Sequence, residues 1–240
     1  GNLLAGADTP TPTVDAPGTY QLTITNLIND CVSSAEVWVG EDVAPPLADA
    51  GPGSELTCSV TEIALSGSGS TGSDFNYTWT SSDGNILSGA STLNPVVDAP
   101  GLYQLEVFNQ DNGCSTLDTV TITTGVAYPV VVAGTADPIT CAVPSIQLDA
   151  AGTDTGVNFI YTWTTAGGNI LSGGNTLTPL VDQPGVYTLA VTNLNNDCVT
   201  TGEVVVPIDT LSPLAEAGQT ALLTCAVQQL QLSGAGSSVG

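Results

Sequence analysis

The stretch Val97-Asp-Ala-Pro-Gly-Leu-Tyr103 decides the fold, because it places a tight turn directly before an alternating run of apolar residues. In such a turn Asp can hydrogen-bond its own backbone, Pro fixes φ and Gly supplies a positive φ. Tyr103, Leu105 and Val107 then alternate with other residues, which is the period of a half-buried β-strand. The stretch therefore predicts a turn that opens a strand.

The same stretch occurs three times in register, at Val14–Tyr20, Val97–Tyr103 and Val181–Tyr187. The segment Gly1-Asn-Leu-Leu-Ala-Gly6 also returns, at offsets of 83 and 84 residues. A period of this length is too long for a solenoid repeat and fits a small all-β domain. Proline-rich linkers around residues 44–46, 128–129 and 212–213 mark the boundaries. We therefore expect an excerpt of a longer repeat protein, divided into part of a first repeat (1–44), two complete repeats (45–127 and 128–211) and the start of a further one (212–240).

One complete repeat contains about seven short apolar runs separated by turn residues, and no helical period. The expected strands are 47–50 continued by 56–60, then 62–65, 75–79, 86–87, 96–97, 103–107 and 120–122. Asp111-Asn-Gly113 is a hairpin turn. This pattern predicts tandem immunoglobulin-like β-sandwiches of about seven strands each.

Aromatic residues mark the expected core. Trp79 and Trp163 lie where a β-sandwich of this class carries its core Trp, on the third strand. Tyr20, Tyr103 and Tyr187 each follow a Pro-Gly turn, where a tyrosine corner is expected.

The composition excludes several classes of function. The chain has no Lys, Arg, His or Met, and 23 acidic residues give it a net charge of −23. It therefore lacks the usual general base, the Schiff-base amine and any group that neutralises phosphate. We expect neither an enzyme nor a nucleic-acid-binding protein, and the absence of an 18-residue apolar run argues against a membrane span.

Six cysteines keep the period of the repeat, in two series: Cys31, Cys114 and Cys198, then Cys58, Cys141 and Cys225. In a secreted chain such cysteines indicate disulfides, and without His or Cys-x-x-Cys they do not indicate zinc. Pairing inside each repeat would give Cys58–Cys114 and Cys141–Cys198. Those partners are expected at opposite ends of a sandwich, farther apart than the roughly 7 Å that a disulfide allows. We therefore favour a bond between repeats, Cys58–Cys198, with the other four cysteines bonded to repeats outside the segment.

The order Tyr-x-Trp, Gly-Asn-Ile-x-Ser-Gly and Pro-x-Val-Asp-x-Pro-Gly-x-Tyr-x-Leu-x-Val-x-Asn before a Cys resembles the PKD-like tandem repeats of Bacteroidota. The resemblance implies a giant surface adhesin or extracellular fibre exported by the type IX secretion system. It departs from the standard pattern after the Trp, where Ser81-Ser-Asp83 only partly matches the aspartate-rich turn. It also implies O-glycosylation at Asp-Thr-aliphatic motifs, which makes Thr119 and Thr210 candidates.

The acidic residues near the linkers are candidate Ca²⁺ ligands, because Ca²⁺ prefers several oxygen ligands. They are Glu41, Asp42, Asp49, Asp137, Asp209 and Glu216. The alternative is a solvated acidic surface, which their irregular spacing favours.

From these features we expect a structural stalk or fibre segment at the cell surface, acting as a spacer for adhesion or cell–cell contact. The alternative is a module that binds glycans or proteins, for which Trp38 is the best single candidate. Self-association into a homo-oligomeric fibre or bundle is also plausible, because few residues are charged and many are Val, Leu or Ile.

Overall fold

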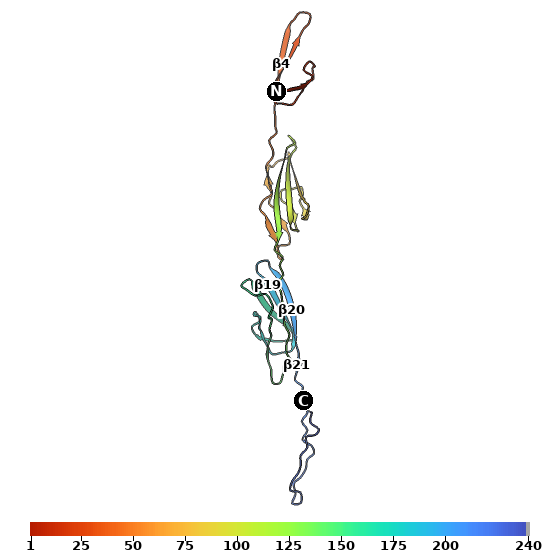
Figure 1. Ribbon diagram of the computed structural model, residues 1–240, viewed down its shortest axis with the longest axis vertical. Coiled ribbons are helices and arrows are strands. Elements are labelled where there is room, and N and C mark those ends of the chain that lie inside the picture. The colour runs from red at the N-terminus through yellow and green to blue at the C-terminus, as the bar shows by residue number, and fades with distance from the viewer. Residues whose placement is uncertain (239–240) are drawn as a thin grey trace. The chain divides into compact units, whose positions relative to one another are not determined.

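A computed structural model describes residues 1–238, and every regular element in that range is a β-strand (Figure 1). The predicted all-β fold is confirmed. The chain divides into two compact units. The first contains Gly1–Leu56 and Val60–Thr124, and the second contains Thr57–Ser59 and the residues from Gly125 onward. The finer four-part division remains a prediction.

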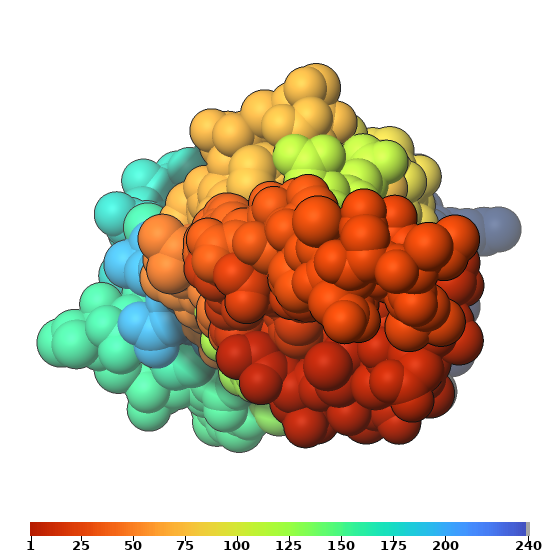
Figure 2. Space-filling view, turned by 90° about the horizontal axis from the view of Figure 1, so that it is seen from above, coloured from red at the N-terminus to blue at the C-terminus, as the bar shows by residue number. Residues whose placement is uncertain are grey.

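The first unit begins with two antiparallel pairs, β1 with β2 and β3 with β4. These strands are β1 (Leu3–Ala5), β2 (Thr13–Val14), β3 (Gly18–Thr25) and β4 (Val32–Val39). Their apolar side chains are largely exposed, and a groove of about 430 Å³ lies between the pairs, lined by Tyr20, Leu22 and Val37 among others. The surface of this segment is red and orange in Figure 2.

The rest of the first unit is a two-sheet sandwich. One sheet has the order β6-β13-β12-β9, with β6 parallel to β13, and the strands β10-β11-β7 and β5-β8 form the other layer. The strands are β5 (Ala48–Asp49), β6 (Ser54–Leu56), β7 (Ile63–Ala64), β8 (Ser68–Gly69), β9 (Phe75–Ser81), β10 (Ile86–Ser88), β11 (Val96–Val97), β12 (Gly101–Asn109) and β13 (Ser115–Thr124). The segments β5 and β6 match the expected split first strand, and β7 and β9–β13 match the other six, whereas β8 lies in a stretch, 66–70, where a polar turn was expected.

Alternation along the strands builds the core, because successive side chains point to opposite faces of a sheet. Tyr103, Leu105 and Val107 of β12 are fully buried, whereas Leu102, directly before them, is half exposed. They pack in one cluster with Ala50, Leu56, Leu65, Trp79, Val97, Val120 and Ile122.

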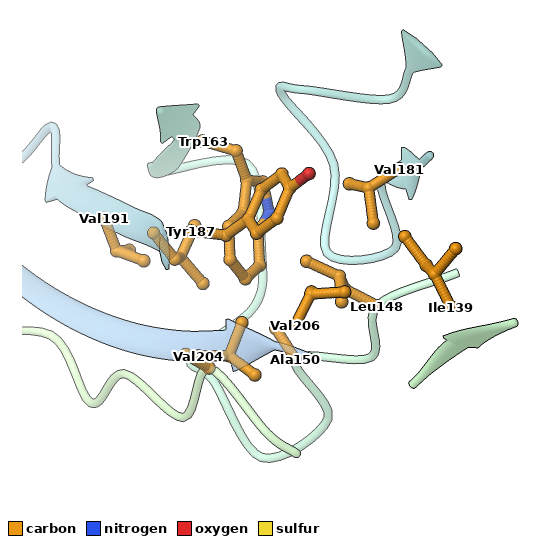
Figure 3. Close-up of a cluster of buried hydrophobic side chains, with 11 residues drawn as sticks. Ile139, Leu148, Ala150, Trp163, Val181, Tyr187, Val191, Val204 and Val206 are labelled. Atoms are coloured by element: carbon orange, nitrogen blue, oxygen red, sulfur yellow. The ribbon is translucent and has the colours of Figure 1, made fainter. Parts of the chain in front are cut away.

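The second unit repeats the sandwich, with sheets β16-β19-β20 and β15-β18-β17 and a parallel pair β14-β21. The strands are β14 (Ile139–Thr140), β15 (Ile146–Gln147), β16 (Phe159–Ala166), β17 (Ile170–Ser172), β18 (Leu180–Val181), β19 (Gly185–Asn193), β20 (Cys198–Val206) and β21 (Ile208–Asp209). Figure 3 shows its core around Trp163 and Tyr187. Residues 211–238 of this unit contain no strand.

The predicted end of the first strand is wrong. The strand expected over 56–60 ends at Leu56, because Thr57–Ser59 leave the first unit and belong to the second. The alternation of apolar residues does not reveal this departure, because Thr57 and Cys58 are only partly buried and Ser59 is exposed.

Candidate functional site

The core aromatic residues occupy equivalent positions in the two sandwiches. Trp79 and Trp163 are 3% and 5% exposed, and each donates its indole N–H to a backbone carbonyl, of Thr92 and Thr176 respectively, at 2.9 Å. A buried indole N–H needs such an acceptor. These residues therefore stabilise the fold.

The tyrosines form the corners that the turn sequences predict. The Tyr103 and Tyr187 hydroxyls donate to the carbonyls of Ala99 and Gln183, four residues upstream, at 2.7 and 2.6 Å. Tyr20 makes the same bond to Ala16 at 2.6 Å, but it is only partly buried and belongs to neither core cluster. Its predicted corner is present, whereas its predicted place in a core is not, because the groove leaves the ring partly open.

Burial raises the pKa of Tyr103, and the nearby carboxylates of Asp98 and Asp83 raise it further. The hydrogen bonds that its hydroxyl makes with the backbone of Asn85 and Ala99 act in the opposite direction. The phenol is thus held neutral in a structural position.

The candidate calcium ligands are not brought together. No group of three or more His, Cys, Asp or Glu residues that could hold a metal ion occurs within residues 1–238. Asp42 instead accepts a hydrogen bond from Asn112, and Asp49 accepts the backbone N–H of Gly51. The other candidates, Glu41, Asp137, Asp209 and Glu216, likewise belong to no such group within the described residues.

The other surface candidates stay separate. Thr119 is exposed on β13 and Thr210 is exposed after β21, so both hydroxyls are accessible. Trp38 is 73% exposed on β4, away from either core cluster. Neither observation identifies a ligand.

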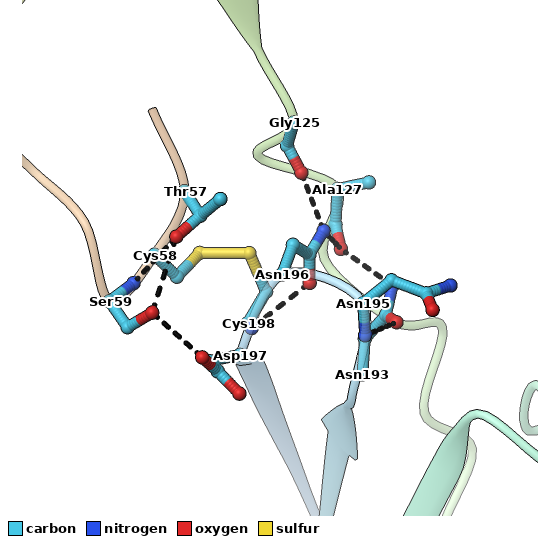
Figure 4. Close-up of a disulfide and its surroundings, with 10 residues drawn as sticks. All are labelled: Thr57, Cys58, Ser59, Gly125, Ala127, Asn193, Asn195, Asn196, Asp197 and Cys198. Atoms are coloured by element: carbon cyan, nitrogen blue, oxygen red, sulfur yellow. Dashed lines mark hydrogen bonds between the residues drawn. A yellow bond between two sulfur atoms is a disulfide. The ribbon is translucent and has the colours of Figure 1, made fainter. Parts of the chain in front are cut away.

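A disulfide in the second unit joins two distant parts of the chain, Cys58 and Cys198 (Figure 4). Their Cα atoms are 5.0 Å apart, and 140 residues separate them in the sequence. This is the pairing favoured from the sequence, and Cys114 and Cys141 are free, so neither alternative pair within a repeat is formed.

Hydrogen bonds accompany the disulfide. The backbone N–H of Cys58 donates to the carbonyl of Asn196 at 3.1 Å, and the Ser59 hydroxyl donates to the Asp197 carboxylate at 2.7 Å. The tripeptide 57–59 is therefore held by backbone, side-chain and covalent contacts.

The partner of this tripeptide is the hairpin turn between β19 and β20, Asn193–Cys198, whose shape follows from its sequence. The Asn193 side chain accepts the N–H of Asn195, and the Asn196 side chain accepts the N–H of Cys198. Asp197 has a φ of 57°, which Asp tolerates better than most residues. Two Asx turns thus aim the Cys198 thiol.

Asn196 has a second role in this hairpin. Its side-chain amide donates to the carbonyls of Gly125 and Ala127, at 2.6 and 3.0 Å, and the residue is only 6% exposed. The amide thereby fixes the segment that enters the second sandwich next to the disulfide. This residue was missed in the sequence, although Asn-x-x-Asn-(Asp/Gly)-Cys recurs in every copy of the hairpin.

The first unit contains the same hairpin without a disulfide, at Asn109–Cys114. Asn112 accepts the N–H of Cys114 at 3.0 Å, and its amide donates to the Asp42 carboxylate and the Ala44 carbonyl. A third copy, Asn26–Cys31, has the corresponding Asx turns. We call Cys31, Cys114 and Cys198 the hairpin cysteines.

The other series, Cys58, Cys141 and Cys225, are the loop cysteines. Around Cys141, the Thr140 hydroxyl accepts the N–H of Val143, and the Thr140 N–H donates to the Val143 carbonyl. Thr224 and Val227 make the same two bonds around Cys225. Both free loops are therefore closed turns with an exposed thiol.

Comparisons with known proteins give no family assignment. No family model matches the sequence, and no curated protein matches it. Solved structures of tandem domains match at low identity and low TM-score. The three N-terminal domains of the bacteriophage RB49 highly immunogenic outer capsid protein have 12% identity and a TM-score of 0.36, with 86% of this chain and 88% of that chain covered.

Two further solved structures are of the same kind. Sidekick-1 immunoglobulin domains 1–5 have 10% identity and a TM-score of 0.35, over 83% of this chain and 48% of that one. Mouse clustered PcdhgC3 EC1-3 has 13% identity and a TM-score of 0.36, over 80% and 77%. The chain thus spans about half of the Sidekick-1 structure that it matches.

Proposed function

We propose that this chain is a structural segment of a secreted cell-surface adhesin or extracellular fibre, a spacer whose repeats are joined covalently to carry tension. The observation that supports it is the Cys58–Cys198 disulfide, which closes a loop across 140 residues. A force applied along the backbone would pass through this bond and bypass the residues inside the loop.

The composition and the contacts support the same role. The core aromatic residues and the tyrosine corners of Tyr103 and Tyr187 are structural features, because they are packed in or against the two cores. Within residues 1–238 there is no helix long and apolar enough to cross a membrane. A disulfide of this kind is typical of oxidising compartments, which supports secretion.

Three finer parts of the proposal rest on the resemblance to PKD-like repeats. They are export by a type IX system, glycosylation at Thr119 and Thr210, and contact with other cell surfaces or glycans. A fourth part, assembly into a homo-oligomeric fibre or bundle, rests on the composition, in which few residues are charged and many are Val, Leu or Ile. We also propose that the free hairpin and loop cysteines, Cys31, Cys114, Cys141 and Cys225, bond to other repeats in the way that Cys198 and Cys58 bond to each other.

Single-molecule stretching from the two ends tests the mechanical role. The oxidised chain should release none of the contour length between Cys58 and Cys198, because the disulfide closes that loop. Reduction should add about 490 Å, since the 140 enclosed residues extend by about 3.5 Å each. The matched control is Cys58→Ser, which should show the full length without reductant. Equal contour lengths for the oxidised and reduced chain would contradict the proposal.

A further inference from the structure

An exposed tryptophan distinguishes the first repeat from the two that follow it. Trp38 corresponds in the repeat to Thr121 and Val205, since each lies seven residues after the hairpin cysteine of its repeat. Both of these residues are exposed on the last long strand of a complete sandwich. Trp38 is itself 73% exposed, and its neighbours Val37 and Val39 line the groove. The indole therefore lies on the outer face of the strand, which faces solvent in the complete repeats as well.

A glycine lets this indole lie along the strand. A Cβ atom at Gly40 would lie 2.5 Å from Cη2 and 2.7 Å from Cζ3 of Trp38, closer than real side chains come. The corresponding residues of the other repeats are Thr123 and Pro207, which do carry a Cβ atom. The first repeat thus combines two departures from the repeat pattern, a Trp and the Gly that accommodates it. One side of the ring lies against Gly40, and the other side is open.

Exposed carboxylates flank the ring on the same strand and just beyond it. Glu36 lies two residues before Trp38 on the same face of β4, about 7 Å away along the strand. Its Oε1 accepts the side-chain N–H of Gln21 across the strand pair at 3.4 Å, which engages one of its two carboxylate oxygens. Glu41 directly follows Gly40 and is exposed. The chain has no Lys, Arg or His, so a side-chain cation that pairs with these carboxylates must come from another molecule.

We propose that Trp38, with Glu36 beside it, is a docking site for an arginine side chain of a basic partner protein. A guanidinium stacks on an aromatic ring and donates to a carboxylate, and Trp offers the most favourable ring for a cation. The net charge of −23 attracts a basic partner and repels an acidic one. A sugar ring can also stack on an indole, but it gains nothing from this charge. The site goes beyond the spacer role and does not depend on it.

Titration of the full chain with a short peptide tests the site. The probe is acetyl-Gly-Arg-Gly-Arg-Gly-amide, and the control peptide carries citrulline, which is uncharged and nearly the same shape, in place of Arg. Trp38→Thr installs the residue of the next repeat and should weaken binding of the Arg peptide about two- to fivefold. In the NMR spectrum the indole N–H of Trp38 should shift, whereas those of Trp79 and Trp163, which are buried and bonded to carbonyls, should not.

Three outcomes of this titration would overturn the proposal. The first is equal affinity of the natural chain and the Trp38→Thr variant for the Arg peptide, which would mean that only the overall charge attracts it. The second is equal binding of the Arg and citrulline peptides. The third is a shift of the Trp38 indole N–H with a soluble oligosaccharide such as cellohexaose and none with the Arg peptide, which would identify a glycan as the ligand.

Transplanting the site into the next repeat gives a second measurement. The triple change Thr119→Glu, Thr121→Trp and Thr123→Gly reproduces its three residues on the exposed face of β13. In the Trp38→Thr chain the triple change should restore the affinity for the Arg peptide. Thr121→Trp alone is the control and should restore less, because it lacks the glycine and the carboxylate. Equal affinities of these two variants would count against a built site. Neither experiment alters the disulfide, so failure here is distinct from failure of the stretching test.

Discussion

The hairpins Asn193–Cys198 and Asn109–Cys114 differ in bonding and hardly at all in shape. Both have two Asx turns and an Asn amide that holds the preceding linker. Yet Cys198 and Asn196 are buried, whereas Cys114 and Asn112 are partly exposed. The local sequence therefore sets the turn, and the tripeptide 57–59 with its disulfide covers it.

Removing the disulfide should have the largest effect on this comparison. Cys58→Ser should destabilise the second unit by about 2–4 kcal/mol, because the loop-closure entropy of the unfolded chain is regained. Hydrogen exchange should then show amide protection in Asn193–Cys198 falling to the level of Asn109–Cys114. Cys114→Ser, which breaks no bond, is the control and should leave both hairpins unchanged. Retained protection in the Cys58→Ser variant would mean that the hydrogen bonds alone cover the hairpin.

The Asn amide is the next contact to remove. Asn196→Ala should cost about 1–3 kcal/mol, since it removes a buried side-chain amide that donates to the Gly125 and Ala127 carbonyls. Asn112→Ala should cost less, because Asn112 is partly exposed and water can replace its amide. Urea unfolding of the two variants measures the difference. Equal losses would show that burial by the tripeptide does not strengthen the contact.

Alkaline pH should destabilise the first unit through Tyr103, which lies in β12 and outside the Asn109–Cys114 hairpin. Burial raises the pKa of Tyr103. The neutral phenol therefore contributes its full stability below about pH 10, where tyrosine in the unfolded chain stays protonated, and loses it as the pH rises through the higher folded-state pKa. Thermal unfolding at pH 8 to 11 should show a steeper loss for the natural chain than for Tyr103→Phe. Identical pH profiles would remove Tyr103 as the cause.

The sequence predicted the fold well because the repeat supplies the same strand pattern more than once. Alternation identified Tyr103 and Trp79 as core residues, and tertiary packing agrees with it. The same reasoning misplaced the end of the strand at Leu56, because Cys58 leaves the strand to bond with Cys198, a contact that the alternation of nearby residues does not encode. Strand geometry favours the pairing of Cys58 with Cys198. The alternative partners within one repeat, such as Cys58 and Cys114, are expected at opposite ends of a sandwich, too far apart for a disulfide.

The polar contacts of the site were harder to predict. Asn196 lies in a hairpin turn, and its Oδ1 forms a local Asx turn with the N–H of Cys198. The opposite end of the same amide, its Nδ2, binds carbonyls about 70 residues away, which no local pattern encodes. For Tyr20 the local hydrogen bond was predictable, whereas its burial depends on strands contributed from elsewhere.

The smallest expected effect concerns the left-handed residue of each hairpin, Asp197 in one and Gly113 in the other, with φ of 57° and 73°. Gly113→Asp should cost about 1 kcal/mol or less, because Asp enters this region at modest cost. Asp197→Gly removes the strain of the left-handed conformation but also removes the hydrogen bond from Ser59, worth about 0.5–1.5 kcal/mol. These two effects oppose each other, so the stability of the Asp197→Gly variant should change little. Thermal unfolding of both variants measures the balance. If Asp197→Gly lowers the free energy of unfolding by more than about 3 kcal/mol, the carboxylate, and not the turn, holds Thr57–Ser59 in the second unit. A change near zero would leave the disulfide as the main restraint on that tripeptide.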